Sequence, residues 1–216
     1  MAIPAFPSNR AFFNLGLLLL IAVSFPRLER NAENVENRPF QILPGSQLFL
    51  KGNSNVTPFT CHCLQAFQPQ QFSMTLRQQS NTAVFQNTRL QIETKKLDCG
   101  NRGMNRDMHQ TLKADAHPYI SIRLQEVQFR PGPNGGLGTL TAKAALTVTG
   151  QTRTVQMQVK TQQSADNNYR FISAVSMKMT DFGITPPTAL LGLVKVDDQI
   201  DIHFDLLVQV DPSPAS

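Results

Sequence analysis

The chain has no tryptophan and only two tyrosines among its 216 residues, although it has 14 phenylalanines. Charged residues make up only 16% of the chain, with a formal net charge of +5. Lys and Arg are scattered, and no basic run is interleaved with aromatics, so we expect no nucleic-acid binding. The shortage of Tyr and Trp makes an outer-membrane barrel the weaker alternative, because such barrels carry aromatic girdles at both membrane interfaces.

Common catalytic motifs are also absent. The chain has no Gly-x-Ser-x-Gly elbow, no His-Glu-x-x-His motif and no phosphate-binding loop. An acidic group follows a turn near the C-terminus and is typical of a solvated face; its members are Asp197, Asp198, Asp201 and Asp205. Asp181 is expected to cap a local turn. We therefore expect a binding protein that is not an enzyme and has no cofactor.

The N-terminal residues have the pattern of an export signal. Arg10 precedes a mostly apolar stretch over residues 11–25, which is shorter than the ~20 residues of a membrane-spanning helix. We expect a signal peptide over residues 1–24 and a flexible lead-in over 25–39. One barrel domain over 40–210 and a disordered tail over 211–216 complete the chain. The expected location is the periplasm or the exterior; an uncleaved anchor or a buried helix is the alternative.

The C-terminal half alternates apolar and polar residues. Apolar side chains occupy every second position in four series, which begin at Leu140, Val155, Phe171 and Ile200. A period of two sends alternate side chains to opposite faces of a strand. Further strands are expected at residues 40–43, 47–52, 57–66, 71–76, 83–96 and 119–129. We predict an all-β fold, a single antiparallel barrel of about eight to ten strands.

Two segments break this alternation. Residues 104–113 have helical spacing, with Met104, Met108 and Leu112 on one face and Asn101 or Asn105 as the cap. Residues 181–196 contain Pro186 and Pro187, which stop strand pairing. This second segment is either a plug that fills the barrel end, which its position favours, or a lip that contacts an apolar guest.

The three cysteines allow one disulfide and leave one cysteine over. Cys61 and Cys63 share a strand face and cannot easily bridge each other, so one of them is expected to pair with Cys99. A metal site that combines Cys-x-Cys, Cys99 and a histidine is the weaker alternative, because common zinc sites favour Cys-x-x-Cys. We therefore expect no metal.

Several motifs together resemble the YceI-like family of exported, lipocalin-like barrels. They cover residues 48–56 and 59–61, the helix segment from Asp98 to Lys113, residues 118–120, 146–150 with Thr152 and Val155, Asp181 to Ile184, and residues 196–200. The family's Asp-x-x-His-Ser opening is absent, with residues 43–46 in its place. The resemblance implies a lipocalin-like barrel of about eight strands, and a Cys61–Cys99 disulfide that leaves Cys63 free.

Some members of this family bind polyisoprenoids, so the resemblance implies a long-chain isoprenoid lipid or isoprenoid quinone as the guest. Met suits such a cavity because its side chain adapts to irregular shapes. The expected lining or lip residues are Phe59, Met157, Val159, Phe182, Ile184, Leu190 and Leu191. The alternative is that they pack on one another, so that a filled barrel acts through its surface as a stress or adaptor protein. Transient membrane contact is compatible with the sequence, and the oligomeric state, a dimer included, stays open.

Overall fold

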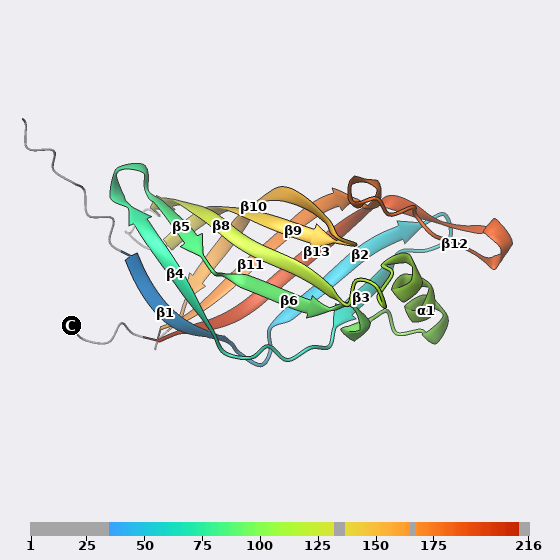
Figure 1. Cartoon of the computed structure of the whole chain (residues 1–216), viewed down its shortest axis with the longest axis horizontal. Coiled ribbons are helices and arrows are strands. Elements are labelled where there is room, and N and C mark those ends of the chain that lie inside the picture. The colour runs from blue at the N-terminus through green and yellow to red at the C-terminus, as the bar shows by residue number, and fades with distance from the viewer. Residues whose placement is uncertain (1–34, 132–136, 165–166, 212–216) are drawn as a thin grey trace, which may run out of the picture. The chain divides into compact units, whose positions relative to one another are not determined.

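The computed structural model describes residues 35–131, 137–164 and 167–211, and these residues form an antiparallel barrel (Figure 1). The expected signal peptide, the lead-in up to residue 34, most of the 131–138 turn and the tail from residue 212 lie outside the described residues. No described helix combines the length and the apolar character that a membrane crossing requires.

Strands dominate the described chain. They are β1 (Val35–Ile42), β2 (Gln47–Ser54), β3 (Phe59–Cys63), β4 (Gln70–Arg77), β5 (Thr82–Gln86), β6 (Arg89–Glu93), β7 (Leu97–Asp98), β8 (Tyr119–Pro131), β9 (Leu137–Val148), β10 (Gln151–Gln163), β11 (Asn168–Lys178), β12 (Thr188–Ala189) and β13 (Val194–Val210). The helical segments are α1 (Arg102–Thr111) and the 3-10 turns η1 (Gln78–Ser80), η2 (Thr94–Lys96), η3 (Met179–Phe182) and η4 (Leu190–Gly192).

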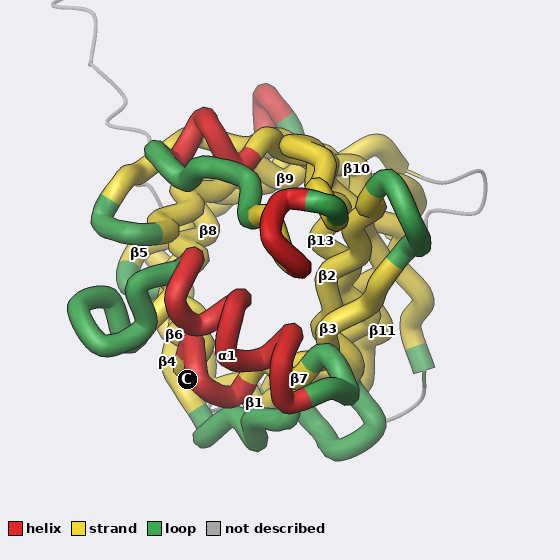
Figure 2. Tube along the Cα trace, turned by 90° about the vertical axis from the view of Figure 1, so that its right-hand side faces the viewer, coloured by secondary structure: helices red, strands yellow, loops and turns green. Residues whose placement is uncertain are grey.

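Eight strands close into a ring in the order β1-β4-β5-β8-β9-β10-β11-β13, and β13 pairs again with β1 (Figure 2). β2 and β3 extend the wall on one side, because β2 pairs with β13 and β3 pairs with β2. On the other side β6 continues the wall along β8. The all-β barrel of about eight strands with one short helix is therefore confirmed.

The alternating series face the barrel interior in register. Leu140 lies opposite Val159, and Ala142 lies opposite Met157, on the paired strands β9 and β10. A cluster of apolar side chains packs there and fills one part of the interior, with the members Phe85, Leu124, Val127, Phe129, Leu140, Ala142, Met157, Val159 and Phe171. The small side chain of Ala142 beside the larger one of Met157 lets the cluster pack closely.

A glutamine side chain completes the wall where β3 and β6 are not hydrogen-bonded to each other as strands. Gln65 Nε2 donates to the carbonyl oxygen of Gln91 at 2.9 Å. The Glu93 amide donates to Gln65 Oε1 at 2.7 Å. The Gln65 amide therefore reproduces one donor and one acceptor of a strand, which links the chain after β3 to β6.

The structure corrects two boundaries. Residues 35–39, expected in the flexible lead-in, form the first part of β1 and pair with β4. The sequence of this part of β1 is polar, so alternation did not indicate a strand there. Glu36 and Arg38, two residues apart, form an ion pair at 2.8 Å. The expected strand over residues 83–96 is divided, because Asn87 adopts a φ of 58° between β5 and β6.

Phe182 tests the packing of this core. Its side chain is 1% exposed and packs with Leu146, Val148 and Ile184. Phe182→Ala should lower the free energy of unfolding by about 3–5 kcal/mol, because truncation leaves a void. Leu191→Ala is the matched control at a fully exposed position and should change stability by less than about 0.5 kcal/mol. Urea unfolding midpoints measure both, and equal effects would contradict this packing.

Candidate functional site

A cavity of about 270 Å³ lies at the α1 end of the barrel. Its walls come from β2, β3, several ring strands, α1 and the 181–196 segment, and Figure 2 looks onto this end. The lining residues are Leu50, Ser54, Thr57, Phe59, Cys61, Cys99, Met104, Asp107, Met108, Thr111, Leu112, Ile120, Val148, Met177, Met179, Ile184, Pro187, Thr188, Ala189, Val194, Val196, Ile200 and Ile202.

Helix α1 forms one wall because its apolar face turns toward the cavity. Asn101 caps the helix, since its side-chain oxygen accepts from the amides of Gly103 at 2.8 Å and Met104 at 3.2 Å. Met104, Met108 and Leu112 then follow at intervals of four residues and all line the cavity. That spacing stacks them on one face of a helix. Their flexible side chains suit a guest of irregular shape.

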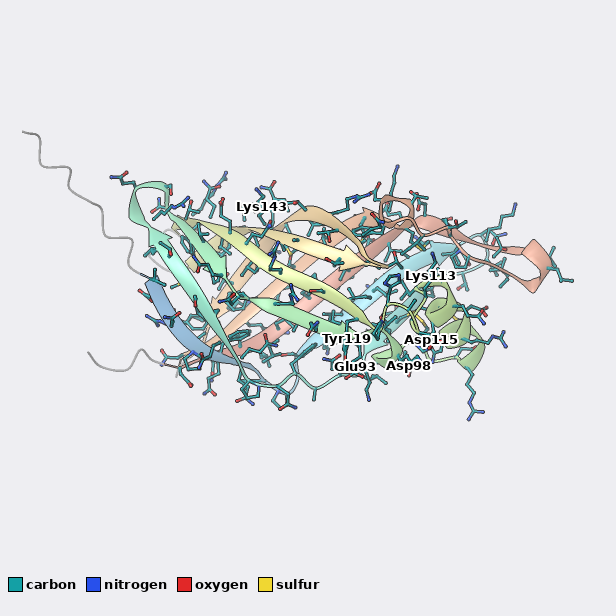
Figure 3. The ribbon with its side chains drawn as sticks, in the orientation of Figure 1. Glu93, Asp98, Lys113, Asp115, Tyr119 and Lys143 are labelled. Carbon is teal, nitrogen blue, oxygen red and sulfur yellow. A yellow bond between two sulfur atoms is a disulfide. The ribbon has the colours of Figure 1, made fainter. Side chains whose placement is uncertain are left out.

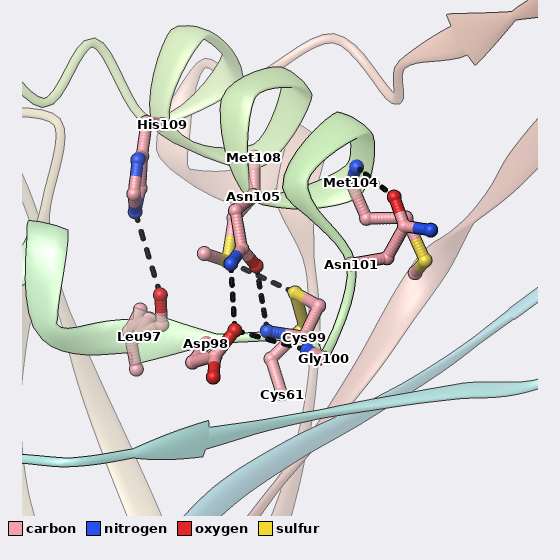
Figure 4. The surroundings of a disulfide bond; sticks show 10 residues. All are labelled: Cys61, Leu97, Asp98, Cys99, Gly100, Asn101, Met104, Asn105, Met108 and His109. Carbon is pink, nitrogen blue, oxygen red and sulfur yellow. Dashed lines mark hydrogen bonds between the residues drawn. A yellow bond between two sulfur atoms is a disulfide. The ribbon is translucent and has the colours of Figure 1, made fainter.

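A disulfide fixes the start of α1 to the barrel wall. Cys61 on β3 is bonded to Cys99, and Cys63 is the free cysteine among the described residues. This confirms the pairing that the resemblance implied. Both bonded cysteines line the cavity, and Met108 Sδ lies 3.5 Å from Cys99 Sγ (Figure 4). Desolvation by burial raises the pKa of the Cys63 thiol, so this thiol is a poor nucleophile at neutral pH.

Asp98 and Asn105 brace the same junction. Asn105 Nδ2 donates to Asp98 Oδ1 at 2.6 Å, and the Cys99 amide donates to Asn105 Oδ1 at 2.7 Å (Figure 4). The hydrogen bond from Asn105, followed by one from the Gly100 amide, lowers the pKa of Asp98. These bonds join β7 to the first turns of α1, so they position the helix over the cavity.

Phe59 on β3 forms another part of the wall. It pairs with Gly52 across β2 and β3, and its ring covers the space where a Cβ at residue 52 would lie. Ile200 also closes on this position, 2.8 Å from the site of that Cβ. Glycine at residue 52 is therefore required by close approach, and it lets Phe59 lie flat against the wall.

The 181–196 segment forms the cavity rim. Pro187, Thr188 and Ala189 line the cavity, but Leu191 and Leu193 are 106% and 75% exposed. The interpretation of this segment as a plug is therefore wrong for Leu191 and Leu193, because neither side chain fills the barrel. Asp198, and not Asp181, holds the adjoining turn: its carboxylate accepts from the amide and the hydroxyl of Thr180 at 2.9 and 2.7 Å.

The expected lining residues are only partly brought together. Phe59 and Ile184 line the cavity, whereas Phe182 packs in the core beside it. Met157 and Val159 lie in the cluster that fills another part of the barrel. Leu191 points into solvent, and the side chain of Leu190 lies outside the described residues.

Sequence reasoning missed most of the α1 and β13 walls. The apolar face of Met104, Met108 and Leu112 was visible in the helical spacing, but it was not assigned to a cavity. The β13 contribution comes from Val196, Ile200 and Ile202. These residues belong to an alternating series, and alternation alone does not distinguish a cavity wall from a packed core.

The chemistry of the lining is apolar. Among the described lining residues, Asp107 is the one ionisable side chain, because Cys61 and Cys99 are bonded to each other. Within the described ranges no group of three or more His, Cys, Asp or Glu side chains could hold a metal ion. The rings of His62 and His203 lie on either side of the Phe49 ring, and their centroids are 5.5 and 4.8 Å from the centroid of that ring. The cavity is therefore built to remove an apolar group from water.

An antiparallel eight-strand barrel with an apolar cavity at one end defines the class of lipocalin-like barrels. The model of the YceI-like domain matches residues 52–208, and the chain belongs to this family. No curated protein matches the chain.

The solved structures that share the fold include the following two. One is BcnA of Burkholderia cenocepacia, which is 17% identical with a TM-score of 0.55, over 75% of this chain and 95% of that one. The other is a polyisoprenoid binding domain from Saccharophagus degradans implicated in plant cell wall breakdown. It is 13% identical with a TM-score of 0.55, over 84% of this chain and 100% of that one.

Removal of the disulfide should destabilise the protein. The bonded cysteines are 38 residues apart, and a bridge over such a loop contributes roughly 3–4 kcal/mol in the chain-entropy model. Cys99→Ser should lose about this much in urea unfolding under oxidising conditions. Cys63→Ser is the control and should keep the stability of the bridged protein and its sensitivity to a reducing agent. Equal midpoints for Cys99→Ser and the parent chain would show that the bridge contributes nothing.

Asp98 should contribute to the pH dependence of stability. Because its folded pKa is lowered, its contribution is complete above the unfolded Asp pKa of about 3.9 and is lost as the pH falls through the folded value. Asp98→Asn keeps the acceptor oxygen but cannot titrate. Its unfolding free energy should therefore decrease less steeply below about pH 4 than that of the parent chain. Urea midpoints at a series of acidic pH values measure this, and parallel curves would refute the assignment.

Proposed function

We propose that this protein is an exported, non-enzymatic carrier that holds the apolar chain of a polyisoprenoid or an isoprenoid quinone. The observation that carries the proposal is the apolar cavity at the α1 end of the barrel, where Asp107 is the one ionisable side chain among the described lining residues. Each methylene-sized group that leaves water for such a cavity contributes roughly 0.8 kcal/mol. The Saccharophagus degradans domain of the same fold, described as polyisoprenoid binding, supports this class of guest.

The size of the cavity limits how the guest is held. A cavity of ~150 Å³ binds one benzene ring, so a space of about 270 Å³ accommodates roughly two isoprene units. A long chain would therefore place one end among Met104, Met108 and Met177, and the remainder would extend beyond the rim. The methionine side chains can move apart to admit a wider or branched chain end.

Export is supported by two independent features. The bridge between Cys61 and Cys99 fits an oxidising compartment. The apolar stretch over residues 11–25 has the length and flanks of a cleaved signal peptide. We propose the periplasm or the exterior as the location of the mature protein. No covalent step is part of the function, because holding an apolar chain needs burial alone.

The second candidate is a barrel that acts through its surface as a stress or adaptor protein. The cluster around Val127, Leu140 and Val159 favours it, because these side chains fill another part of the barrel interior. Native mass spectrometry of the purified protein, followed by organic extraction, separates the two candidates. Copurified lipid or uptake of added geranylgeraniol supports the carrier. The absence of both supports the surface-acting protein.

Two substitutions of alanine by tryptophan test the cavity. Ala189 lines the cavity, whereas Ala174 is exposed on β11. Ala189→Trp should fill the space and weaken geranylgeraniol binding by at least about tenfold, since it displaces more than one methylene-sized group of the guest. Ala174→Trp adds the same ring away from the cavity and should bind like the parent chain. Titrations followed by native mass spectrometry measure both; unchanged binding by Ala189→Trp would place the guest elsewhere.

A further inference from the structure

Three large apolar side chains are exposed at the end of the barrel where the cavity lies. Val56, Leu191 and Leu193 are 67%, 106% and 75% exposed. Val56 follows β2, and the two leucines lie in and after η4, at the tip of the β12–β13 hairpin, which projects beyond the barrel (Figure 1). We call these three residues the apolar tip. Exposed apolar groups that gather in one place mark an interaction surface.

The apolar tip is held in position by one asparagine. Asn55 Nδ2 donates to the carbonyl oxygen of Leu193 at 2.9 Å, and the Lys195 amide donates to Asn55 Oδ1 at 2.7 Å. The Asn55 amide donates to the carbonyl oxygen of Lys195 at 3.0 Å. The turn after β2 and the β12–β13 hairpin are thus fastened together, so Val56 and the two leucines are presented as one fixed unit.

Leu191 is held in an unfavourable conformation. Its φ of 57° and ψ of 31° lie in the left-handed region, where a residue with a Cβ is strained. This conformation accompanies a side chain that is 106% exposed, so neither packing nor backbone preference explains why a leucine occupies the position. Strain of this kind gathers at functional sites.

The apolar tip adjoins the cavity rim in the chain. Ser54 and Thr57 line the cavity on either side of Val56, and Ala189 and Val194 line it on either side of η4 and Leu193. A surface that contacts the tip would therefore lie against the rim. The part of a long isoprenoid that the cavity cannot hold would emerge at this same place.

Basic side chains lie on and around α1, at the end of the barrel that carries the tip, where Figure 3 labels Lys113. A surface hollow there is lined by residues that include Lys95, Arg102, Arg106 and Lys113. Asp115 pairs with Lys95 at 2.6 Å, and Asp107 pairs with Arg106 at 3.3 Å. Within the described ranges no carboxylate is paired with Arg102 or Lys113. Lys195 adds a further exposed charge on the hairpin.

We propose that this end of the barrel docks on the surface of an anionic lipid bilayer. The apolar tip enters the interface, while Arg102 and Lys113 face the lipid phosphate groups. Apolar side chains flanked by basic ones are the combination that binds such surfaces. The docking places the cavity rim against the hydrocarbon, so an isoprenoid chain end passes between bilayer and cavity without crossing water. This last step depends on the proposed carrier function; the docking itself does not.

A single introduced tryptophan tests the contact, because the chain contains none. Leu191→Trp in the full chain should shift its emission to shorter wavelength when phosphatidylglycerol vesicles are added, and brominated acyl chains should quench it. Gln79→Trp is the matched control, since Gln79 is exposed in η1 at the opposite end of the barrel (Figure 1). Its emission should not change. No change in Leu191→Trp, or equal quenching at both positions, would overturn the proposal.

A charge-reversed chain tests the second part of the surface. Adding Arg102→Glu and Lys113→Glu to Leu191→Trp should weaken partition into phosphatidylglycerol vesicles by about tenfold or more, because each basic residue near an anionic surface adds to binding. The control adds Lys143→Glu to Leu191→Trp. It replaces a basic side chain that points away from the ring on β9 (Figure 3), and partition should be unchanged. Equal partition of the two variants would exclude the role given to Arg102 and Lys113.

The docking and the carrier function fail in different experiments. Uptake of geranylgeraniol in solution, combined with no vesicle-dependent change in Leu191→Trp, would leave the carrier function intact and refute the docking. Vesicle contact through Leu191 without uptake of geranylgeraniol would support the docking and refute the carrier function.

Discussion

Closure of the sheet by β13 is the constraint on which the other features depend. This strand has 17 residues and pairs with β11 along one edge. Its other edge pairs with β2 over residues 196–205 and with β1 over residues 208–210. A closed ring leaves no unpaired edge, so the barrel needs no partner to satisfy its strands there. Because one strand spans the length of the wall, it contributes both to the filled interior and to the cavity.

The two kinds of interior follow from what closes each part of the barrel. Around Val127 and Phe171, side chains from the strands β5, β8, β9, β10 and β11 pack on one another. At the other end the wall continues on β2, β3 and β6, and α1 and the 181–196 segment cover the space. A helix is attached by its side chains alone, so its position must be fixed by specific bonds. The Cys61–Cys99 bridge and the Asp98–Asn105 pair supply them.

Side chains that replace backbone partners recur at this end. The side-chain amide of Gln65 bonds to the backbone of β6, as a neighbouring strand would. The side-chain amide of Asn55 does the same with the β12–β13 hairpin. Asp198 holds the turn at Thr180 in the same manner. Such replacements give backbone donors and acceptors a partner where no neighbouring strand supplies one, so the wall can open for a cavity. The low content of charge and the many amide side chains of the sequence suit this architecture.

The sequence by itself determined the fold class, the family and the position of the helix. Alternation from Leu140 to Val148 and from Ile200 to Val210 specifies strands because a period of two fits only an extended chain. The helix at Arg102–Thr111 follows from its cap at Asn101 and its spacing. Only the tertiary structure decided which inward side chains face a cavity. Met157 and Met177 occupy equivalent places in two alternating series, yet Met157 packs in the core and Met177 lines the space. The difference arises from what lies across the barrel from each, and this depends on closure between residues far apart in the chain.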